Sequence, residues 1–120
     1  MLINELSKKT GVSIHTIRFY EIKGLIQGVT NESVKTNNYK NYDDSHVEKI
    51  SVIKEAQEVG FTLSEIKILL DKWYSGTFPK EEQLKFFDTK INEVDIKIRQ
   101  LKQIRRRLED VRKDIEKGEC

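Results

Sequence analysis

The chain has 120 residues, of which 37% are hydrophobic and 35% are charged, and its 22 Lys and Arg nearly balance its 20 Asp and Glu. A chain of this length forms one compact domain, or a small domain with one long element. No stretch approaches the roughly 20 consecutive apolar residues that span a bilayer, and the N-terminus lacks the basic start and apolar run of a secretory signal, so we expect a cytoplasmic protein.

Two short helices joined by a tight turn open the chain. The apolar spacing predicts a helix over 3–9, and Gly11 suits the turn after it because glycine adopts positive backbone angles without strain. Ser13 is a favourable N-cap for a second helix, which Gly24 ends. Two short helices around a glycine-containing turn are typical of a helix-turn-helix. The apolar positions of the second helix are Ile14, Ile17, Phe19 and Tyr20.

A β-hairpin wing and two further helices are expected next. Over 27–44 the helical period disappears and two tyrosines alternate in Asn38–Tyr42, which favours a hairpin. A third helix is predicted over 45–59, with Gly60 as its stop. Thr62 and Glu65 have the spacing of a capping box, so a fourth helix begins there. The apolar positions are Val47, Ile50, Ile53 and Ala56 in the third helix and Leu63, Ile66, Leu69, Leu70 and Trp73 in the fourth.

Pro79 is placed to open one long final helix, whose coiled-coil part covers 80–118. Its apolar residues alternate at intervals of three and four, with one extra step of three between Leu101 and Ile104. At about 1.5 Å per residue this stripe is roughly 46 Å long, too long for the first 74 residues to cover. We therefore expect a second copy of the chain to cover it, in a homodimer. The dimerisation residues are Leu84, Phe87, Ile91, Val94, Ile98, Leu101, Ile104, Leu108, Val111 and Ile115.

Net charge does not single out a nucleic-acid surface. Residues 1–45 carry six basic and five acidic side chains, residues 46–74 four and five, and residues 75–120 twelve and ten. A DNA-binding prediction must therefore rest on the positions of the cations. The second helix of a helix-turn-helix lies in the major groove, where Arg18 can donate bidentately to guanine or to a phosphate. The positions expected to contact double-stranded DNA are Ser13, His15, Thr16, Arg18 and Tyr20.

The order of these motifs resembles that of the MerR family of bacterial transcription regulators. The run Gly11–Ile26, which contains Gly-Val-Ser, Arg-Phe-Tyr-Glu and Gly-Leu, is similar to the family's signature. Asn38–Tyr42 and Val59–Ile66 resemble its wing strand and a later turn. The resemblance implies a mainly α fold. It consists of a winged helix-turn-helix DNA-binding domain of four helices and a small β-hairpin over 1–74, a hinge over 75–79, and a long antiparallel coiled-coil dimerisation helix over 80–118.

The resemblance also implies a function and further DNA contacts. The family's homodimers bind a pseudo-palindromic promoter site and distort its spacer, so the implied partners are promoter DNA, a second copy of the chain and RNA polymerase. No cofactor is expected, and the sequence identifies no effector. Lys40 and Lys54 stand where the family has arginine, and lysine keeps the charge but loses the bidentate fork, so we expect phosphate contacts there. The full predicted DNA-binding set is Ser13, His15, Thr16, Arg18, Phe19, Tyr20, Lys23, Lys35, Tyr39, Lys40 and Lys54.

Several other features have plainer interpretations, which we prefer. Arg105–Arg107 is expected to be a solvated face, or to contact acidic residues of the partner helix, rather than to bind DNA. His46 is expected to be exposed in a helix's first turn, without a metal role. Cys120 is the only cysteine, so it excludes an internal disulfide, and redox sensing is the alternative to an incidental role. Interdomain packing, with a ligand pocket as the alternative, is expected of Trp73, Tyr74, Phe78, Phe86 and Phe87.

Two rival functions stand beside DNA-binding regulation. A protein with this fold that has lost DNA binding would be an adaptor or chaperone modulator acting through its coiled coil, and the near-neutral first domain motivates this reading. An enzyme is disfavoured because the sequence has no paired carboxylates, nucleophile with a base, glycine-rich phosphate loop or metal-ligand cluster. Binding to random duplex DNA at low salt separates the first rival from a regulator, because phosphate attraction does not depend on base sequence.

Overall fold

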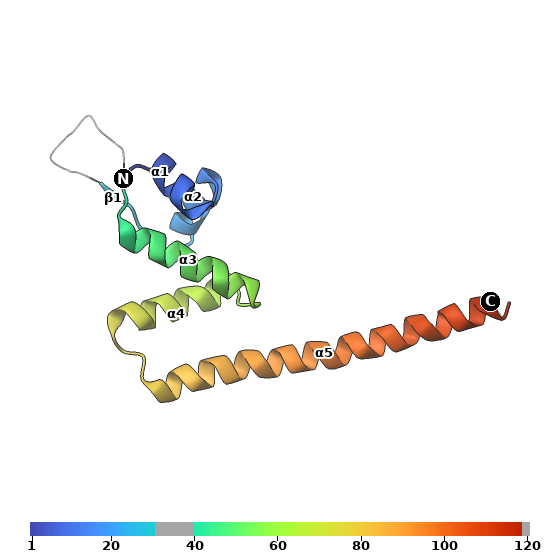
Figure 1. Cartoon of the computed structure of the whole chain (residues 1–120). Helices are drawn as coiled ribbons and strands as arrows, with labels where there is room; N and C mark the ends of the chain where they lie inside the picture. Colours follow the sequence, from blue (N-terminus) through green and yellow to red (C-terminus); the bar gives the residue numbers. More distant parts are fainter. Residues whose placement is uncertain (31–39, 119–120) are drawn as a thin grey trace. The chain divides into compact units, whose positions relative to one another are not determined.

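The computed structural model describes residues 1–30 and 40–118. The described residues are mainly helical and include one small β-hairpin (Figure 1). The chain divides into two compact units, Met1–Phe78 and Pro79–Cys120. This arrangement confirms the predicted fold class, a mainly α protein with a hairpin wing and a long C-terminal helix. Among the helices that the structure describes, none has the length and apolar character needed to cross a membrane.

The chain begins with the predicted pair of short helices, α1 (Ile3–Thr10) and α2 (Ile14–Ile22). Gly11 ends α1 with a φ of 71°, a left-handed conformation that glycine adopts without a steric penalty. The Ser13 hydroxyl oxygen then accepts a hydrogen bond from the Thr16 backbone N–H at 3.1 Å, which caps α2. Both the turn and the cap agree with the sequence pattern.

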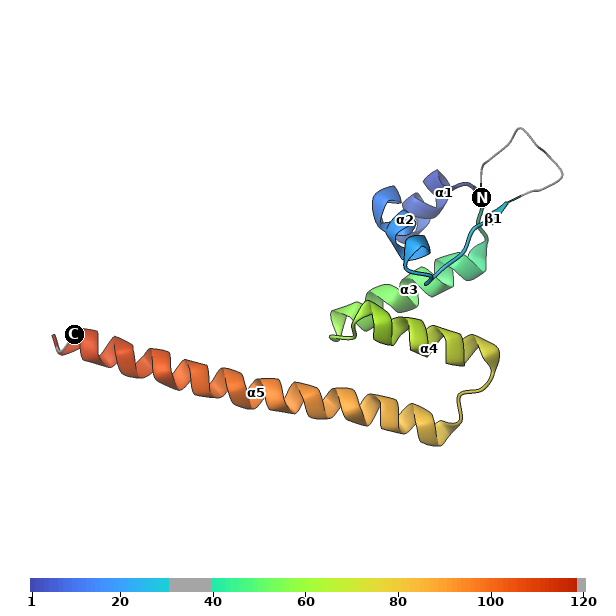
Figure 2. The ribbon, with the colours of Figure 1, turned by 180° about the vertical axis from the view of Figure 1, so that it is seen from behind.

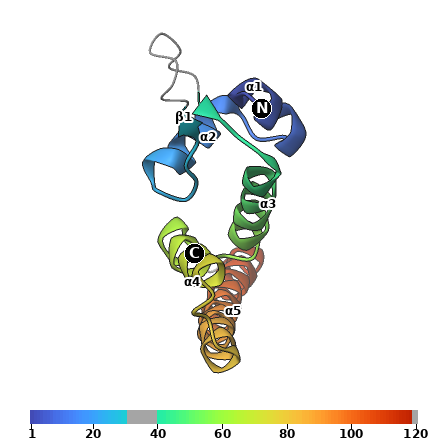
Figure 3. The same cartoon turned by 90° about the vertical axis from the view of Figure 1, so that its left-hand side faces the viewer.

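The wing is built on two short antiparallel strands, β1 (Val29–Thr30) and β2 (Lys40–Asn41), with Val29 opposite Asn41. The backbone N–H of Tyr42, just after β2, donates to the carbonyl of the first residue at 2.7 Å. The N-terminal amino group donates in return to the Tyr42 carbonyl. The start of the chain therefore lies beside the hairpin (Figures 1 and 3).

The third helix, α3 (Asp44–Glu58), begins one residue earlier than predicted because Asp43 caps it. The Asp43 carboxylate accepts from the Ser45 backbone N–H at 2.9 Å. His46 was expected to be exposed, and this expectation is wrong because its side chain is only 7% exposed. Its Nδ1 accepts from the Asp43 backbone N–H at 3.0 Å, and its Nε2 donates to the Gln27 carbonyl at 2.7 Å. His46 thus joins the start of α3 to the segment before β1.

The fourth helix, α4 (Leu63–Ser75), begins at the predicted capping box. The Thr62 hydroxyl oxygen accepts from the Glu65 N–H at 3.2 Å, and the Glu65 carboxylate accepts from the Thr62 N–H at 2.9 Å. Trp73, which the sequence pattern grouped with the apolar positions of this helix, is exposed. Its ring contacts that of Phe78 edge to face, with centroids 6.4 Å apart.

The core of the first unit lies where the helices meet. Helix α3 contacts both α1 and α4, and α1 contacts α2. Helix α3 therefore lies between the helix-turn-helix and α4, as seen from the front and from behind (Figures 1 and 2). Each fully buried large aliphatic side chain contributes about 1.5–3 kcal/mol by leaving water. The largest fully buried side chains are Leu6, Ile17, Ile50, Ile53 and Ile66.

The second unit contains α5 (Lys80–Glu116), a helix of 37 residues. Pro79 is its N-cap rather than its first helical residue. All ten predicted dimerisation residues, from Leu84 to Ile115, are exposed in the single chain, by 40 to 66%. A helix with this much exposed apolar surface requires a partner to cover it.

Candidate nucleic-acid interface

The outward face of α2 carries four of the side chains that could meet DNA. Ile17 and Tyr20 are buried and define the inward face of the helix. His15, Arg18 and Phe19 are exposed and follow the i, i+3, i+4 spacing that places side chains on one helical face. Ile22, the fourth, completes this spacing at i+7 and is also exposed. Ile22 is absent from the predicted DNA-binding set, although the same helical periodicity identifies it.

Ser13 and Thr16 occupy the start of the same helix. The Ser13 hydroxyl donates to the Thr16 hydroxyl oxygen at 2.9 Å and accepts from the Thr16 backbone N–H at 3.1 Å. Ser13 is exposed and Thr16 is half-buried. Their first role is therefore to cap α2, which fixes the direction in which His15 and Arg18 project.

Tyr20 does not belong to this outward face, which corrects the sequence-based set. Its side chain is only 4% exposed, and its hydroxyl donates to the Gln57 side-chain oxygen of α3 at 3.1 Å. Burial also raises the pKa of the Tyr20 phenol. The helical period that turns Arg18 outward turns Tyr20 inward, so Tyr20 packs α2 against α3 instead of facing a ligand.

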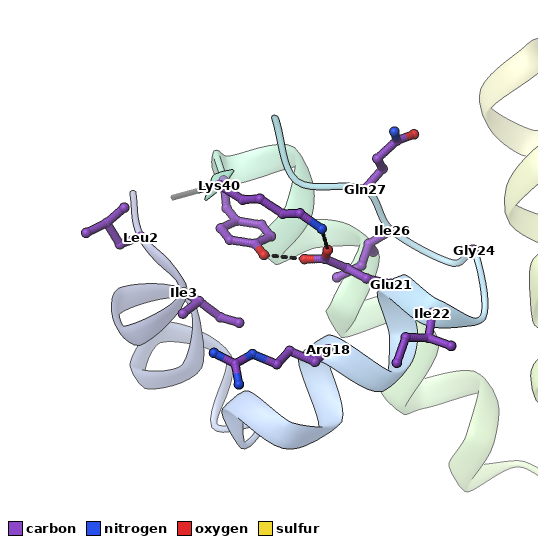
Figure 4. Close-up of a pocket in the computed structure, with 10 residues that line it drawn as sticks. Leu2, Ile3, Arg18, Glu21, Ile22, Gly24, Ile26, Gln27 and Lys40 are labelled. Atoms are coloured by element: carbon purple, nitrogen blue, oxygen red, sulfur yellow. Dashed lines mark hydrogen bonds and ion pairs between the residues drawn. The ribbon is translucent and has the colours of Figure 1, made fainter. Parts of the chain in front are cut away.

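Glu21 connects α2 to the wing. One oxygen of its carboxylate accepts a short hydrogen bond from the Tyr42 hydroxyl, and the other forms an ion pair with the Lys40 ammonium at 2.7 Å (Figure 4). Burial, with a smaller contribution from the hydrogen bond to the Glu21 carboxylate, raises the pKa of the Tyr42 phenol well above its usual value. Tyr42 and Lys40 therefore engage both oxygens of the Glu21 carboxylate and hold β2 against the last turn of α2.

A hollow of about 670 Å³ lies between the start of α1, the second half of α2 and β2. Arg18 and Ile22 line it together with Leu2, Glu21 and Lys40 (Figure 4). The Arg18 guanidinium has no hydrogen bond or ion pair with any residue in the described part of the chain. Glu21 is already paired with Lys40. The Arg18 charge is therefore available to an anion outside the first unit, Met1–Phe78, which we call the lobe.

The three predicted lysine contacts that the structure describes have different surroundings. Lys40 is paired with Glu21, and the Lys54 ammonium donates to the Thr10 carbonyl at 3.2 Å, where it stabilises the C-terminal end of α1. Lys23 is exposed and lies over the Phe19 ring, 5.5 Å from its centroid. Of these three lysines, Lys23 is the one whose ammonium makes no hydrogen bond or ion pair with a described residue.

The remaining predictions concern residues outside the outward face of α2 and the hollow. Lys35, Tyr39 and Cys120 lie outside the described residues. Arg105 is ion-paired to Glu109 within its own helix at 2.9 Å, which agrees with the solvated face expected there. Within 1–30 and 40–118 there is no group of three or more His, Cys, Asp or Glu that could hold a metal ion.

Comparison with known proteins agrees with a DNA-binding face on this lobe. The model of the MerR HTH family regulatory protein matches residues 1–73, and the model described as MerR, DNA binding, matches residues 47–111. The mercuric resistance operon regulatory protein of Bacillus cereus is 38% identical over 111 residues, which are 92% of this chain and 81% of that protein. The transcriptional regulator CueR of Yersinia pestis is 34% identical over 109 residues, 90% of this chain and 76% of that protein.

Solved structures share the fold of this chain. The transcription regulator PbrR691 from Ralstonia metallidurans CH34, solved in complex with lead(II), has a TM-score of 0.84 and 30% identity and covers 95% of this chain and 86% of its own. HiNmlR, a MerR family regulator lacking the sensor domain and bound to promoter DNA, shares the fold with a TM-score of 0.63, 24% identity and coverage of 98% and 91%. The chain therefore belongs to the MerR family of transcription regulators, which bind promoter DNA and function as dimers.

Proposed function

We propose that the chain recognises a specific pseudo-palindromic promoter site, with α2 of each subunit in the major groove of one half-site. The observation that carries this proposal is the Arg18 guanidinium, which is exposed on the outward face of α2 and makes no ion pair within the described residues. Arginine on a recognition helix binds guanine or phosphate bidentately. His15 and Phe19 project from the same face and complete the contact surface. A protein that acts on promoters in this way works in the cytoplasm.

The dimer is formed by α5 paired with α5 of a second copy. The apolar stripe of α5 runs from Leu84 to Ile115 and has its midpoint between Ile98 and Leu101, so its spacing is nearly the same when read from either end. In an antiparallel pair, Ile98 would therefore lie level with the partner's Leu101, and Leu84 with the partner's Ile115. Such a register buries all ten seam residues of each copy.

Charged residues beside the seam support the antiparallel register. Asp88 and Asp95 flank the first half of the stripe, and Arg105 and Arg112 flank the second half on the same side. The antiparallel register places Asp95 within one residue of the level of the partner's Arg105, and Asp88 within one residue of the partner's Arg112, so side chains of opposite charge lie close to each other.

The two lobes of such a dimer would contact two half-sites on one face of the duplex. Regulation then follows from distortion of the spacer between them, and its energy depends on how easily that DNA bends and untwists. This part of the proposal is supported by the family to which the chain belongs. RNA polymerase is the machinery that would respond to the realigned promoter elements.

Footprinting of genomic DNA fragments tests the proposed function. The purified protein should protect a site with two related half-sites, and Arg18→Ala should weaken binding about 10-fold or more, because a bidentate contact contributes about 1–3 kcal/mol. Arg106→Ala removes the same charge from an exposed position on α5 and serves as the matched control. Equal effects of the two substitutions would show that the assigned recognition helix is wrong.

One observation favours the rival adaptor function. Residues 1–78 carry ten basic and ten acidic side chains, so the lobe has no net charge to attract DNA. A gel shift with random duplex DNA at low salt separates the two functions. Retarded bands support a regulator, whereas their complete absence would leave the coiled coil as the functional surface.

A further inference from the structure

Ile22, the last residue of α2, is the most exposed large apolar side chain in the described part of the molecule. It is 80% exposed, whereas Ile17, on the inward face of the same helix, is completely buried. A single exposed apolar residue is common on protein surfaces and needs no explanation by itself. Ile22 differs from such isolated residues because it lies on the outward face of α2 among the residues proposed to contact DNA.

Ile22 stands one helical turn beyond Arg18 and lines the same hollow (Figure 4). It shares the outward face of α2 with Arg18 and with Phe19, which is itself 39% exposed. The neighbouring polar groups do not reach out to cover this apolar surface, because Glu21 is held by Tyr42 and Lys40. The recognition face therefore presents a guanidinium that extends toward Ile3 and, one helical turn along α2, an uncovered apolar side chain (Figure 4).

We propose that Ile22 reads the 5-methyl group of a thymine in the major groove. This methyl group is the apolar feature that distinguishes thymine there, and aliphatic side chains contact it. Four helical residues span about 6 Å, which corresponds to about two base-pair steps of 3.4 Å. Ile22 thus sets a preference for thymine about two base pairs from the position that Arg18 contacts. The inference rests on the proposed function, because it requires α2 to enter the major groove.

The test removes the methyl group from the DNA and the side chain from the protein. Half-sites are first selected from a random duplex library with the wild-type dimer, and duplexes of the selected sequence are then made with each thymine replaced by uracil, which lacks only the 5-methyl group. At one position, uracil should weaken wild-type binding about fourfold, the effect of one buried methyl group. Ile22→Ala should bind the thymine duplex more weakly by at least that factor and should bind thymine and uracil equally at that position.

Ile68→Ala is the matched control, because Ile68 is a half-exposed isoleucine on α4 of the same lobe. It should keep both the wild-type affinity and the wild-type ratio between thymine and uracil duplexes. Ile22 is on the surface, so its replacement by alanine leaves the core intact, and a circular dichroism spectrum and melting curve equal to the wild type verify this.

Each other outcome overturns the inference in a recognisable way. If Ile22→Ala weakens binding but keeps the preference for thymine over uracil, Ile22 does not read the methyl group. The selected half-sites could also lack a thymine at a fixed distance from the position that depends on Arg18. This result, too, would show that Ile22 does not read a thymine methyl group. If the wild-type protein selects no sequence at all, the proposed function fails together with the inference, whereas sequence-specific binding that depends on Arg18 and not on Ile22 removes the inference alone.

Discussion

The Tyr42 hydroxyl donates a hydrogen bond to the Glu21 carboxylate and so joins the residue after β2 to the last turn of α2. Both side chains are largely removed from solvent, with Tyr42 4% exposed and the Glu21 side chain 11% exposed. Tyr42 also makes backbone hydrogen bonds with the first residue of the chain. A single aromatic residue therefore holds the N-terminus, the wing and the recognition helix in one arrangement.

Tyr42→Phe should lower the free energy of unfolding by about 1–3 kcal/mol, because a buried carboxylate loses a hydrogen bond. Urea denaturation followed by circular dichroism measures the change. Tyr74→Phe is the control, since it removes a hydroxyl from a partly exposed tyrosine on α4 and should change stability by less than about 0.5 kcal/mol. A similar loss in both variants would show that the hydrogen bond to Glu21 does not stabilise the lobe.

Thr62→Ala should destabilise the lobe by about 0.5–2 kcal/mol, because it removes the hydroxyl that caps α4. Ser64→Ala, two residues later and exposed, keeps the capping box and should be neutral or slightly stabilising. Denaturant titration of the two variants side by side measures the difference. Equal stability of Thr62→Ala and the wild type would mean that the packing of α4 on α3 fixes the helix start without the cap.

The elements that the sequence predicted well are those with local causes. Gly11 needs only its own positive backbone angle, and the reciprocal bonds of Thr62 and Glu65 lie within one turn. The apolar seam of α5 repeats over many turns, so its helix could be predicted from spacing alone. The predicted start of α3 differs from the observed start by one residue. Asp43 and Ser45 are both favourable N-cap residues, and the local sequence does not decide between them.

Of the two residues that were placed incorrectly, His46 depends on a contact between distant segments. His46 is buried because its ring bonds to the carbonyl of Gln27, which is nineteen residues away in the sequence. Tyr20 was assigned to the DNA-facing side from its residue type and from the family motif, although the helical period from Ile17 already directed it inward. The likeness to a family motif shows that a residue matters without showing whether it contacts the ligand or supports the helix.

Asp43 should make the stability of the lobe dependent on pH in the acid range. Chiefly a hydrogen bond from the Ser45 hydroxyl lowers the pKa of the Asp43 carboxyl from its ordinary 3.8 to about 2. Since the folded state binds this proton more weakly than the unfolded state, the ionised cap stabilises the fold above the unfolded pKa, and that stability is lost as the pH falls through about 2.

The variant that tests this linkage is Asp43→Asn, which retains a capping side chain but cannot ionise. The difference in unfolding free energy between wild type and variant should be constant near neutral pH and should shrink as the pH falls from about 5 to about 2. Denaturation curves at a series of pH values give this difference. Asp44→Asn changes the neighbouring residue and leaves the Asp43 cap in place, so its difference from the wild type should not follow the same course. A pH-independent difference for Asp43→Asn would contradict the lowered pKa.

The orientation of the α5 pair can be determined by cysteine cross-linking in a Cys120→Ser background. In the antiparallel register, position 84 lies level with position 115 of the partner subunit and roughly 46 Å from position 84 of the partner, whereas a disulfide needs Cα atoms about 4.4–6.8 Å apart. Leu84→Cys alone should therefore remain monomeric on a non-reducing gel after mild oxidation, and Leu84→Cys with Ile115→Cys should form a covalent dimer. Cross-linking of the single variant would demonstrate a parallel pair, and sedimentation of both variants verifies that each is still a dimer before oxidation.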